Sequence, residues 1–312
     1  MGPEGTFHRS VMVEEVLAHL EPAGGGEIMD GTAGGGGHSH ALLVRYPACR
    51  VIAVDRDPIA LEATRIALQE HQDRVSFVES RFDEAAVELG ARGPRLSGAL
   101  LDLGMSTHQL DLDKRGFSFR REVTLDMRMA GNSRGEPTAA DLLNTLDEAE
   151  LGRVFRVYGE EPRWRRLARA VSLLREDRPF RVAGDLIEAM AKAFRRFPTA
   201  KDRARVFQAL RVAVNQEIDA LRAALPALLE ALLPGGVVTV ISYESLTDRV
   251  VKQTFREWSR ECTCPPGLPI CVCCGEPLGG VVVKRVVRPS DREVDENPRA
   301  RSARLRSWRK AA

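Results

Sequence analysis

The stretch Asp30-Gly31-Thr32-Ala33-Gly34-Gly35-Gly36-Gly37-His38 decides the fold. It joins a short strand expected over residues 27–30 to a helix expected over residues 38–46. Glycines let the backbone turn tightly and approach a ligand closely, and a helix N-terminus presents free N–H groups. In this strand–loop–helix context the run indicates a nucleotide-type cofactor site, whereas a glycine run alone is also compatible with a flexible turn.

Two carboxylates separate the cofactor classes. Asp55 ends the next apolar strand, 21 residues after Gly34, where a carboxylate can hold both ribose hydroxyls. Asp30 precedes the first glycine, where its charge would repel a pyrophosphate and attract the ammonium group of the methionine part of S-adenosylmethionine. The sequence therefore favours S-adenosylmethionine over a nicotinamide dinucleotide.

The rest of the chain predicts a doubly wound α/β sheet with an insertion. Strands are expected over 50–55, 75–78 and 98–102, and strand character returns at 236–242 and 280–287. The intervening stretch is mainly helical, with helices expected over 139–157, 163–175, 184–196 and 202–233. We expect one discontinuous α/β domain over 1–110 and 206–312, with a helical insertion over 111–205.

The composition is that of a soluble globular protein. Of 312 residues, 44% are hydrophobic and 29% charged, and the formal net charge is +2. No apolar run approaches the roughly 20 residues that span a bilayer. No signal peptide is visible at the N-terminus, so we expect a cytoplasmic protein.

Blocks along nearly the whole chain resemble the bacterial 16S ribosomal RNA cytosine-N4 methyltransferases, the ribosomal small subunit methyltransferase H family. The blocks occur in the family's order. They cover residues 8–12, 30–39, 53–58, 100–104, 109–111, 115–119, 125–129, 158–160, 207–211, 242–249 and 297–302. The resemblance implies a class I (Rossmann-like) S-adenosylmethionine-dependent methyltransferase sheet with a mainly helical inserted domain.

The same resemblance implies an activity and a set of contacts. The activity is methyl transfer to the exocyclic N4 of a cytidine in the decoding centre of 16S ribosomal RNA, within the small ribosomal subunit. The implied cofactor contacts are Gly36, Gly37, His38, Asp55, Phe82, Asp102 and Gln109. Phe82 would lie beside the adenine, although from the residues alone it is only an apolar loop residue.

Asp102 is the candidate catalytic residue. It ends the strand over 98–102, and the carboxyl ends of parallel strands face one crevice, so Asp55 and Asp102 should share it. A cytosine amino group is a poor nucleophile that must be aligned and must lose a proton, and Asp102 is expected to accept its hydrogen bond. The alternative is that Asp102 only caps a neighbouring loop.

The sequence departs from related patterns near this position. Other amino methyltransferases carry Asp/Asn-Pro-Pro-aromatic, whereas this chain reads Asp102-Leu103-Gly104-Met105. The family's usual Ser-Phe-His-Ser is Ser242-Tyr243-Glu244-Ser245 here, which puts a catalytic role of that histidine in doubt.

Arginine clusters in the insertion suggest RNA contacts, because arginine forks bind phosphate oxygens. The candidates are Arg115, Arg128, Arg163, Arg166 and Arg205. The alternatives are solvated helix faces and a module that merely covers the sheet edge. The basic stretch from Asn297 onward is expected to be partly extended and to close over RNA or the cofactor cleft.

A cysteine cluster near the C-terminus suggests a metal site in a cytosolic protein. Cys262, Cys264, Cys271 and Cys274 offer enough thiolates for a tetrahedral structural zinc ion. Reduced loop cysteines are the alternative.

Three other functions share some of these sequence features. A dehydrogenase would share the loop and Asp55 but not the blocks from 100 to 129, and a non-catalytic RNA-binding protein would not need a complete cofactor loop. A methyltransferase acting on another nucleic acid or on protein is the serious alternative. The sequence leaves open monomer or homodimer, and assembled subunit or free RNA as substrate.

Overall fold

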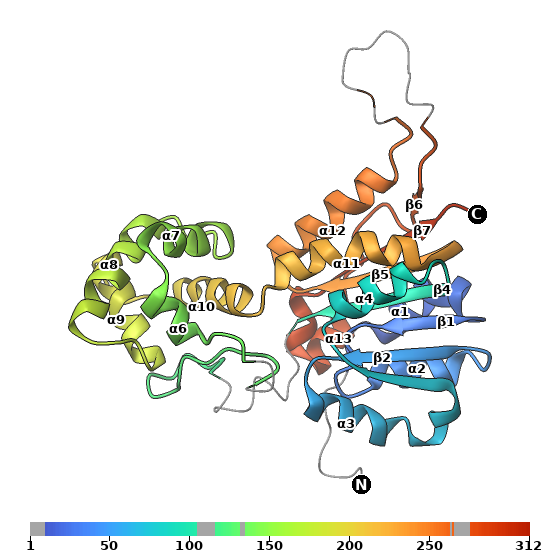
Figure 1. Cartoon of the computed structure of the whole chain (residues 1–312), viewed down its shortest axis with the longest axis horizontal. Coiled ribbons are helices and arrows are strands. Elements are labelled where there is room, and N and C mark those ends of the chain that lie inside the picture. Colours follow the sequence, from blue (N-terminus) through green and yellow to red (C-terminus); the bar gives the residue numbers. More distant parts are fainter. Residues whose placement is uncertain (1–9, 105–115, 132–134, 263, 265–274) are drawn as a thin grey trace. The chain divides into compact units, whose positions relative to one another are not determined.

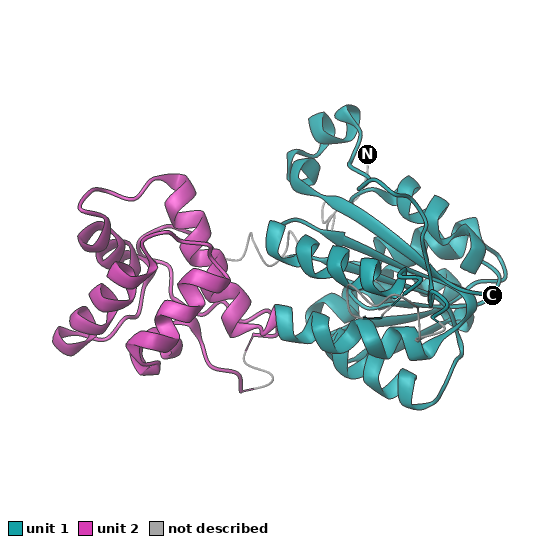
Figure 2. Cartoon of the chain, turned by 90° about the horizontal axis from the view of Figure 1, so that it is seen from above, with its two compact units in different colours: residues 1–104, 218–312 teal, residues 105–217 magenta. Residues whose placement is uncertain are grey.

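The computed structural model describes residues 10–104, 116–131, 135–262, 264 and 275–312. Two compact units are distinguished, the first comprising residues 1–104 and 218–312 and the second residues 105–217 (Figure 2). The boundaries expected from the sequence are 110/111 and 205/206.

The first unit is a sheet covered by helices (Figure 1). Its strands are β1 (Glu27–Asp30), β2 (Arg50–Asp55), β3 (Val75–Glu79), β4 (Leu96–Leu103), β5 (Leu232–Ser242), β6 (Gly279–Val281) and β7 (Arg304–Lys310). Its α-helices are α1 (Val13–Leu20), α2 (Gly37–Arg45), α3 (Pro58–Ala67), α4 (Phe82–Ala91), α11 (Glu217–Ala231), α12 (Ser245–Trp258) and α13 (Asp291–Glu296). Short 3₁₀ turns occupy Glu21–Ala23, Gln69–Arg74 and Pro298–Ser302.

Within the described residues, the strand order is β3-β2-β1-β4-β5-β7-β6. The first five strands in this order are parallel, whereas β7 runs antiparallel to β5 and β6 antiparallel to β7. The predicted doubly wound α/β fold is confirmed. In such a sheet the order reverses between β1 and β4, and ligands bind outside the carboxyl ends of the strands at that point.

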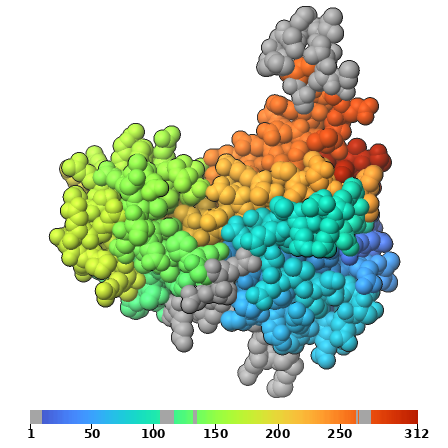
Figure 3. Space-filling model, in the orientation of Figure 1, coloured from blue at the N-terminus to red at the C-terminus, as the bar shows by residue number. Residues whose placement is uncertain are grey.

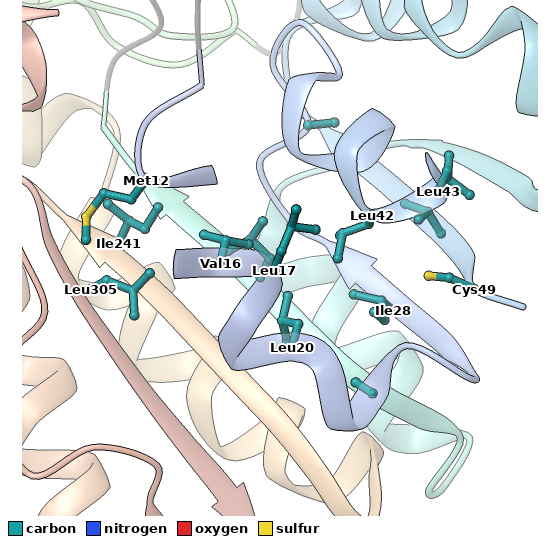
Figure 4. Packing of buried hydrophobic residues seen from close by; sticks show 14 of the residues in the cluster. Met12, Val16, Leu17, Leu20, Ile28, Leu42, Leu43, Cys49, Ile241 and Leu305 are labelled. Carbon is teal, nitrogen blue, oxygen red and sulfur yellow. The ribbon is translucent and has the colours of Figure 1, made fainter. Parts of the chain in front are cut away.

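The core beneath the glycine loop is built by α1, α2 and the sheet. Val16 and Leu20 of α1 and Leu42 of α2 are buried together with Ile28 of β1 (Figure 4). These apolar side chains lie on one face of each helix, so their burial packs α2 against the sheet. The start of α2, which follows the glycine loop, is thereby held in place.

The basic stretch from Asn297 onward, which was expected to be partly extended, ends in the strand β7. This strand lies inside the sheet, between β5 and β6, and closure of the stretch over RNA or the cofactor cleft stays a prediction. Leu305 and Trp308 are fully buried, and Trp308 donates a hydrogen bond to Ser259 Oγ. The arginines at positions 304, 306 and 309 made this stretch look like a charged tail, although Arg306 pairs with Asp248 at 2.7 Å and the two buried side chains lie on opposite faces of the strand. The strand expected over 280–287 is correspondingly shorter, ending at Val281.

The second unit is helical. It contains α6 (Ala139–Thr145), α7 (Glu148–Val157), α8 (Trp164–Asp177), α9 (Ala183–Phe194) and α10 (Ala200–Val214). The helix expected over 202–233 is interrupted at Asn215 and Gln216, where Gln216 has φ 51°. Asn215 accepts a hydrogen bond from Met129 N and donates one to Met127 O, which ties the end of α10 to this unit.

Candidate functional site

The glycine loop closes a tight cradle between β1 and α2. Gly34 and Gly36 have φ of 57° and 81°, a conformation that favours glycine. Gly31 N donates to Leu100 O at 2.9 Å, which joins the loop to β4. No side chain among the described residues caps the start of α2, so its first N–H groups remain available as donors.

At three of its glycines the loop leaves little room for a side chain. A Cβ atom on Gly31 would lie 2.5 Å from Leu101 Cδ2, and one on Gly37 would collide with Ser10 Oγ. On Gly36 it would approach Ala67 Cβ to 3.3 Å. The predicted contact residues Gly36 and Gly37 therefore lie where only a backbone surface fits.

Asp30 shapes this loop from inside. Its side chain is buried, Oδ1 accepts a hydrogen bond from Thr32 N at 3.2 Å, and Oδ2 accepts one from Ser39 Oγ at 2.6 Å. Burial raises the pKa of Asp30 against the opposing effects of His38, Ser39 and Thr32. Both oxygens thus hold the loop and the first turn of α2, and the predicted contact with a ligand ammonium group stays a prediction.

Asp55 lies at the carboxyl end of β2, next to the loop. Its Oδ2 accepts a hydrogen bond from Gly34 N at 2.8 Å and its Oδ1 accepts one from Asp57 N at 2.9 Å. Burial raises the pKa of Asp55 to about 6, although both backbone hydrogen bonds lower it. A carboxylate fixed by two amides is well placed to accept further hydrogen bonds from hydroxyl groups.

Asp102 lies near the end of β4 and contacts the glycine loop and α2. Its backbone N donates to Thr32 Oγ1 at 2.7 Å. Its Oδ2 lies 3.5 Å from His38 Nε2 of α2. Asp102 Oδ1 and both ring nitrogens of His38 are buried and have no hydrogen-bond partner within the described chain. Buried polar atoms without partners are costly, so this group is arranged to receive polar atoms from a ligand.

Tyr243 is a site residue that the sequence analysis did not assign. It follows Ser242, which pairs with Leu103 across β4 and β5, and a Cβ on Gly104 would lie 2.9 Å from its ring. Burial and then the charge and hydrogen bond of Asp102 raise the pKa of Tyr243 strongly, so the phenol stays protonated. The signal that could have found it is its place directly after a strand adjacent to Asp102.

His38 is surrounded by carboxylates. Burial alone lowers its pKa, but the nearby Asp102 carboxylate, followed by the charges of Asp30 and Glu293, outweighs burial and raises it. Glu293 comes from α13 and accepts a hydrogen bond from Met12 N at 2.7 Å. Glu293, shortly before the basic stretch that begins at Asn297, therefore lies near the edge of the site.

The remaining predicted cofactor contacts divide into two. Phe82 begins α4, and its Cβ lies 3.1 Å from where a side chain on Gly31 would begin, so Phe82 adjoins the loop, and its contact with an adenine stays a prediction. Gln109 lies outside the described residues. The structure thus brings together Asp30, Gly36, Gly37, His38, Asp55, Phe82 and Asp102 at one edge of the sheet.

The predicted RNA contacts have carboxylate partners in several cases. Arg128 pairs with Asp126 at 2.8 Å, and both Arg163 and Arg205 pair with the buried side chains of Glu161 and Asp202. Arg166 is exposed, and Arg115 lies outside the described residues. Contact of these arginines with RNA stays a prediction.

The cysteine cluster is only partly described. Cys262 is exposed and Cys264 partly buried, whereas Cys271 and Cys274 lie outside the described residues. Among the residues that the structure does describe, no group of three or more metal-ligating side chains is found. No helix among the residues that the structure describes is both long enough and apolar enough to cross a membrane.

Comparisons with known proteins give a consistent result. A family model described as "MraW methylase family" matches residues 5–311. The chain is 45% identical to ribosomal RNA small subunit methyltransferase H of Gemmatimonas aurantiaca, over 99% of this chain and 97% of that protein. Proteins of the same name from Anaeromyxobacter sp. (strain K) and Heliobacterium modesticaldum are 46% and 45% identical, each over 97% of this chain and over 97% and 98% of their own lengths.

Proposed function

This chain belongs to the MraW methylase family, and from that membership we propose that it transfers a methyl group from S-adenosylmethionine to the exocyclic N4 of a cytidine in 16S ribosomal RNA. The observation that carries the proposal is the Asp102 carboxylate. It lies beside the glycine cradle at the carboxyl ends of the strands, held by Thr32 and His38, with one oxygen lacking a partner in the described chain. The relatives' names supply the substrate, the small-subunit RNA.

The residues present fit S-adenosylmethionine. The backbone cradle at Gly36 and Gly37 and the uncapped start of α2 suit the amino-acid part of the molecule. Asp55 suits the ribose hydroxyls, and Phe82 suits a flat adenine ring. When bound, S-adenosylmethionine supplies a methyl group activated by its sulfonium centre.

The chain's own residues align and deprotonate the acceptor. Asp102 accepts a hydrogen bond from the N4 amino group, which directs the nitrogen lone pair toward the methyl group. On receiving the methyl group N4 would become more acidic, and the Asp102 carboxylate, which already accepts its hydrogen bond, would take the proton that leaves. His38 and Tyr243 keep Asp102 oriented so that it can stabilise the growing positive charge on N4.

Assays with radiolabelled S-adenosylmethionine test the substrate class. Unmodified small ribosomal subunits, free 16S RNA, DNA and total ribosomal protein are offered separately. We expect label in 16S RNA, and the comparison of the first two arms decides between assembled subunit and free RNA. Label confined to DNA or protein would instead favour the alternative methyltransferase. Action on ribosomes implies a cytoplasmic location.

A structural zinc ion on Cys262, Cys264, Cys271 and Cys274 is a separate proposal from the sequence, with reduced cysteines as its alternative. Elemental analysis of protein purified without added metal tests it. About one zinc per chain supports the site, and only traces refute it. The proposed methyl transfer does not depend on this zinc ion.

A further inference from the structure

The turn between α9 and α10 presents an aromatic ring to solvent. The side chain of Phe197 is 63% exposed, compared with 37% for Phe119, another exposed phenylalanine of the same unit. Burying a phenylalanine normally stabilises a fold by roughly 1.5–3 kcal/mol. The chain therefore forgoes that gain at Phe197, on the surface of the helical unit (green to yellow in Figure 3).

The turn that carries Phe197 is held firmly. Arg195 has φ 54°, and the Arg196 guanidinium donates a hydrogen bond to the carbonyl of Phe197 at 3.0 Å. Arg196 also pairs with Asp202 at 2.7 Å, and Asp202 and Thr199 cap the start of α10 reciprocally. The exposed ring is thus presented by a fixed backbone rather than by a loose end.

Several arginines behind the turn are already paired with carboxylates of the same unit. The buried carboxylates of Glu161 and Asp202 both contact Arg163, at 2.8 and 2.7 Å, and Arg205, at 3.1 Å each. The Arg163 guanidinium also stacks on Phe194, 3.6 Å from the ring centroid. Arg163, Arg196 and Arg205 therefore act inside the unit, as the framework of the turn.

Other cations remain around Phe197. The Arg203 guanidinium carbon lies 6.0 Å from the Phe197 ring centroid, and Arg195 and Lys201 are exposed. Between residues 195 and 205 the only acidic residue of the sequence is Asp202, and its side chain is buried. The segment that carries the ring therefore presents positive charge.

We propose that Phe197, Arg195, Lys201 and Arg203, here called the Phe197 platform, bind an unpaired segment of RNA. This inference rests on the proposed function, which supplies RNA as the substrate. An exposed ring stacks on a base irrespective of its sequence, and flanking cations contact the adjacent phosphates. The positive charge favours RNA over an apolar protein partner, which would leave Lys201 and Arg203 unpaired at the interface.

Phe197→Ala tests the stacking, with Leu173→Ala as a matched control. Leu173 is 55% exposed on α8 of the same unit, so both variants remove one exposed apolar side chain. We expect Phe197→Ala to raise KM for ribosomal RNA and the Kd for a single-stranded RNA oligonucleotide roughly 10-fold. Phe197→Trp keeps an aromatic ring, so it should leave both values near those of the wild type. In all of these variants kcat at saturating RNA and the Kd for S-adenosylmethionine should stay unchanged.

The outcomes separate this inference from the proposed function. Unchanged RNA affinity in Phe197→Ala, or an equal loss in Leu173→Ala, overturns the platform. Wild-type protein that binds the oligonucleotide through Phe197 but methylates no RNA overturns the proposed function alone. Loss of binding to a ribosomal protein, with RNA binding intact, assigns the surface to a protein partner and also overturns the platform.

The charges are tested by salt dependence. Lys201→Gln should reduce the slope of log Kd against log salt for the oligonucleotide by about 0.7, the value for one phosphate contact on a single strand. Lys192→Gln is the control, because Lys192 already pairs with Glu188 at 3.3 Å. Equal slopes in wild type and Lys201→Gln would remove Lys201 from the platform.

Discussion

His38 Nε2 lies 3.5 Å from Asp102 Oδ2, so the first turn of α2 and the end of β4 are joined at their polar groups. The two residues are 64 positions apart in the sequence, yet the core beneath α2 holds them together. His38 Nδ1 and Asp102 Oδ1 lack hydrogen-bond partners among the described residues, so they are available to polar atoms of a ligand. It links the cofactor loop to the expected catalytic carboxylate.

Asp102→Asn tests the catalytic role. The amide keeps the size of the side chain but loses its negative charge, so it stabilises the positive charge on N4 less well. We expect kcat to fall roughly 100-fold or more, the range for a positioned acid or base. Single-turnover methylation with saturating S-adenosylmethionine measures it. Normal turnover in this variant would demote Asp102 to a structural role.

Asp55 predicts a pH dependence of cofactor binding. Its pKa is raised to about 6, mainly by burial, with Asp57 and Asp30 nearby adding to the shift. The ionised form accepts hydrogen bonds from ribose hydroxyls, so affinity for S-adenosylmethionine should be constant above about pH 7 and fall below pH 6. The limiting fall is about 10-fold per pH unit for a single group.

Calorimetric titrations between pH 5 and 8 check this dependence. Asp55→Asn should bind more weakly than wild type above pH 6, approach wild type as the pH falls toward 5, and lose the Asp55 contribution to the slope. The sign for folding is opposite: because the folded pKa is raised, the contribution of Asp55 to stability is present at low pH and lost as pH rises toward 6. Wild-type affinity that ignores pH in this window contradicts the assignment of Asp55.

Gly36→Ala and Gly93→Ala separate backbone strain from the cofactor cradle. Both glycines have positive φ, 81° and 82°, so each alanine should cost about 1–2 kcal/mol of stability. A Cβ on Gly93 meets nothing within 4 Å, whereas one on Gly36 approaches Ala67 and Thr64 to 3.3 Å. We expect only Gly36→Ala to weaken S-adenosylmethionine binding, by roughly 10-fold, which is about 1.4 kcal/mol. Equal affinities in the two variants would exclude Gly36 from the cradle.

Asp202→Asn tests the ion pairs behind the Phe197 platform. Removing one charge weakens the charge-assisted hydrogen bonds from the partly exposed guanidinium groups of Arg163 and Arg205, so we expect a loss of about 1–3 kcal/mol in the free energy of unfolding. Asp219→Asn is the control, because Asp219 is 64% exposed and its pair with Arg222 at 3.9 Å contributes little. Urea denaturation measures both, and equal small losses would mean that the buried pairs do not stabilise the unit.

The same carboxylate predicts acid sensitivity. Burial alone would raise the pKa of Asp202, but hydrogen bonds from Thr199, Arg196 and Arg163 lower it well below the ordinary value of 3.8. Its contribution to stability is therefore complete above about pH 4 and is lost as pH falls further. Asp202→Asn should flatten that part of the pH profile of unfolding, whereas Asp219→Asn should leave it unchanged.

The parallel part of the sheet could be predicted because its strands are apolar runs bounded by turn residues. Residues 50–55 and 98–102 are buried on both faces, which gives a continuous pattern that resists misreading. The glycine loop and Asp55 were likewise predictable, since a strand, a turn and a helix start follow one another locally. These features fixed the cofactor class and the edge of the sheet where the site lies.

The parts that escaped prediction depend on distant partners. The arginines of β7 conceal its buried residues, and β7 pairs with β5, more than 60 residues away in the chain. Arg163 meets Asp202 only after α8 and α10 are packed, so its neighbours in sequence suggest a free cation. Tyr243 reaches Asp102 through the pairing of β4 with β5, which sequence spacing alone does not encode.

The central claim is that the chain methylates the N4 atom of a cytidine in small-subunit RNA. Its most direct test is mass spectrometry of nucleosides released from 16S RNA after incubation with the protein and S-adenosylmethionine. The account predicts N4-methylcytidine, formed by wild-type protein and strongly reduced with Asp102→Asn. Methylation at a carbon atom of the base, on another nucleoside or on the ribose alone would contradict it.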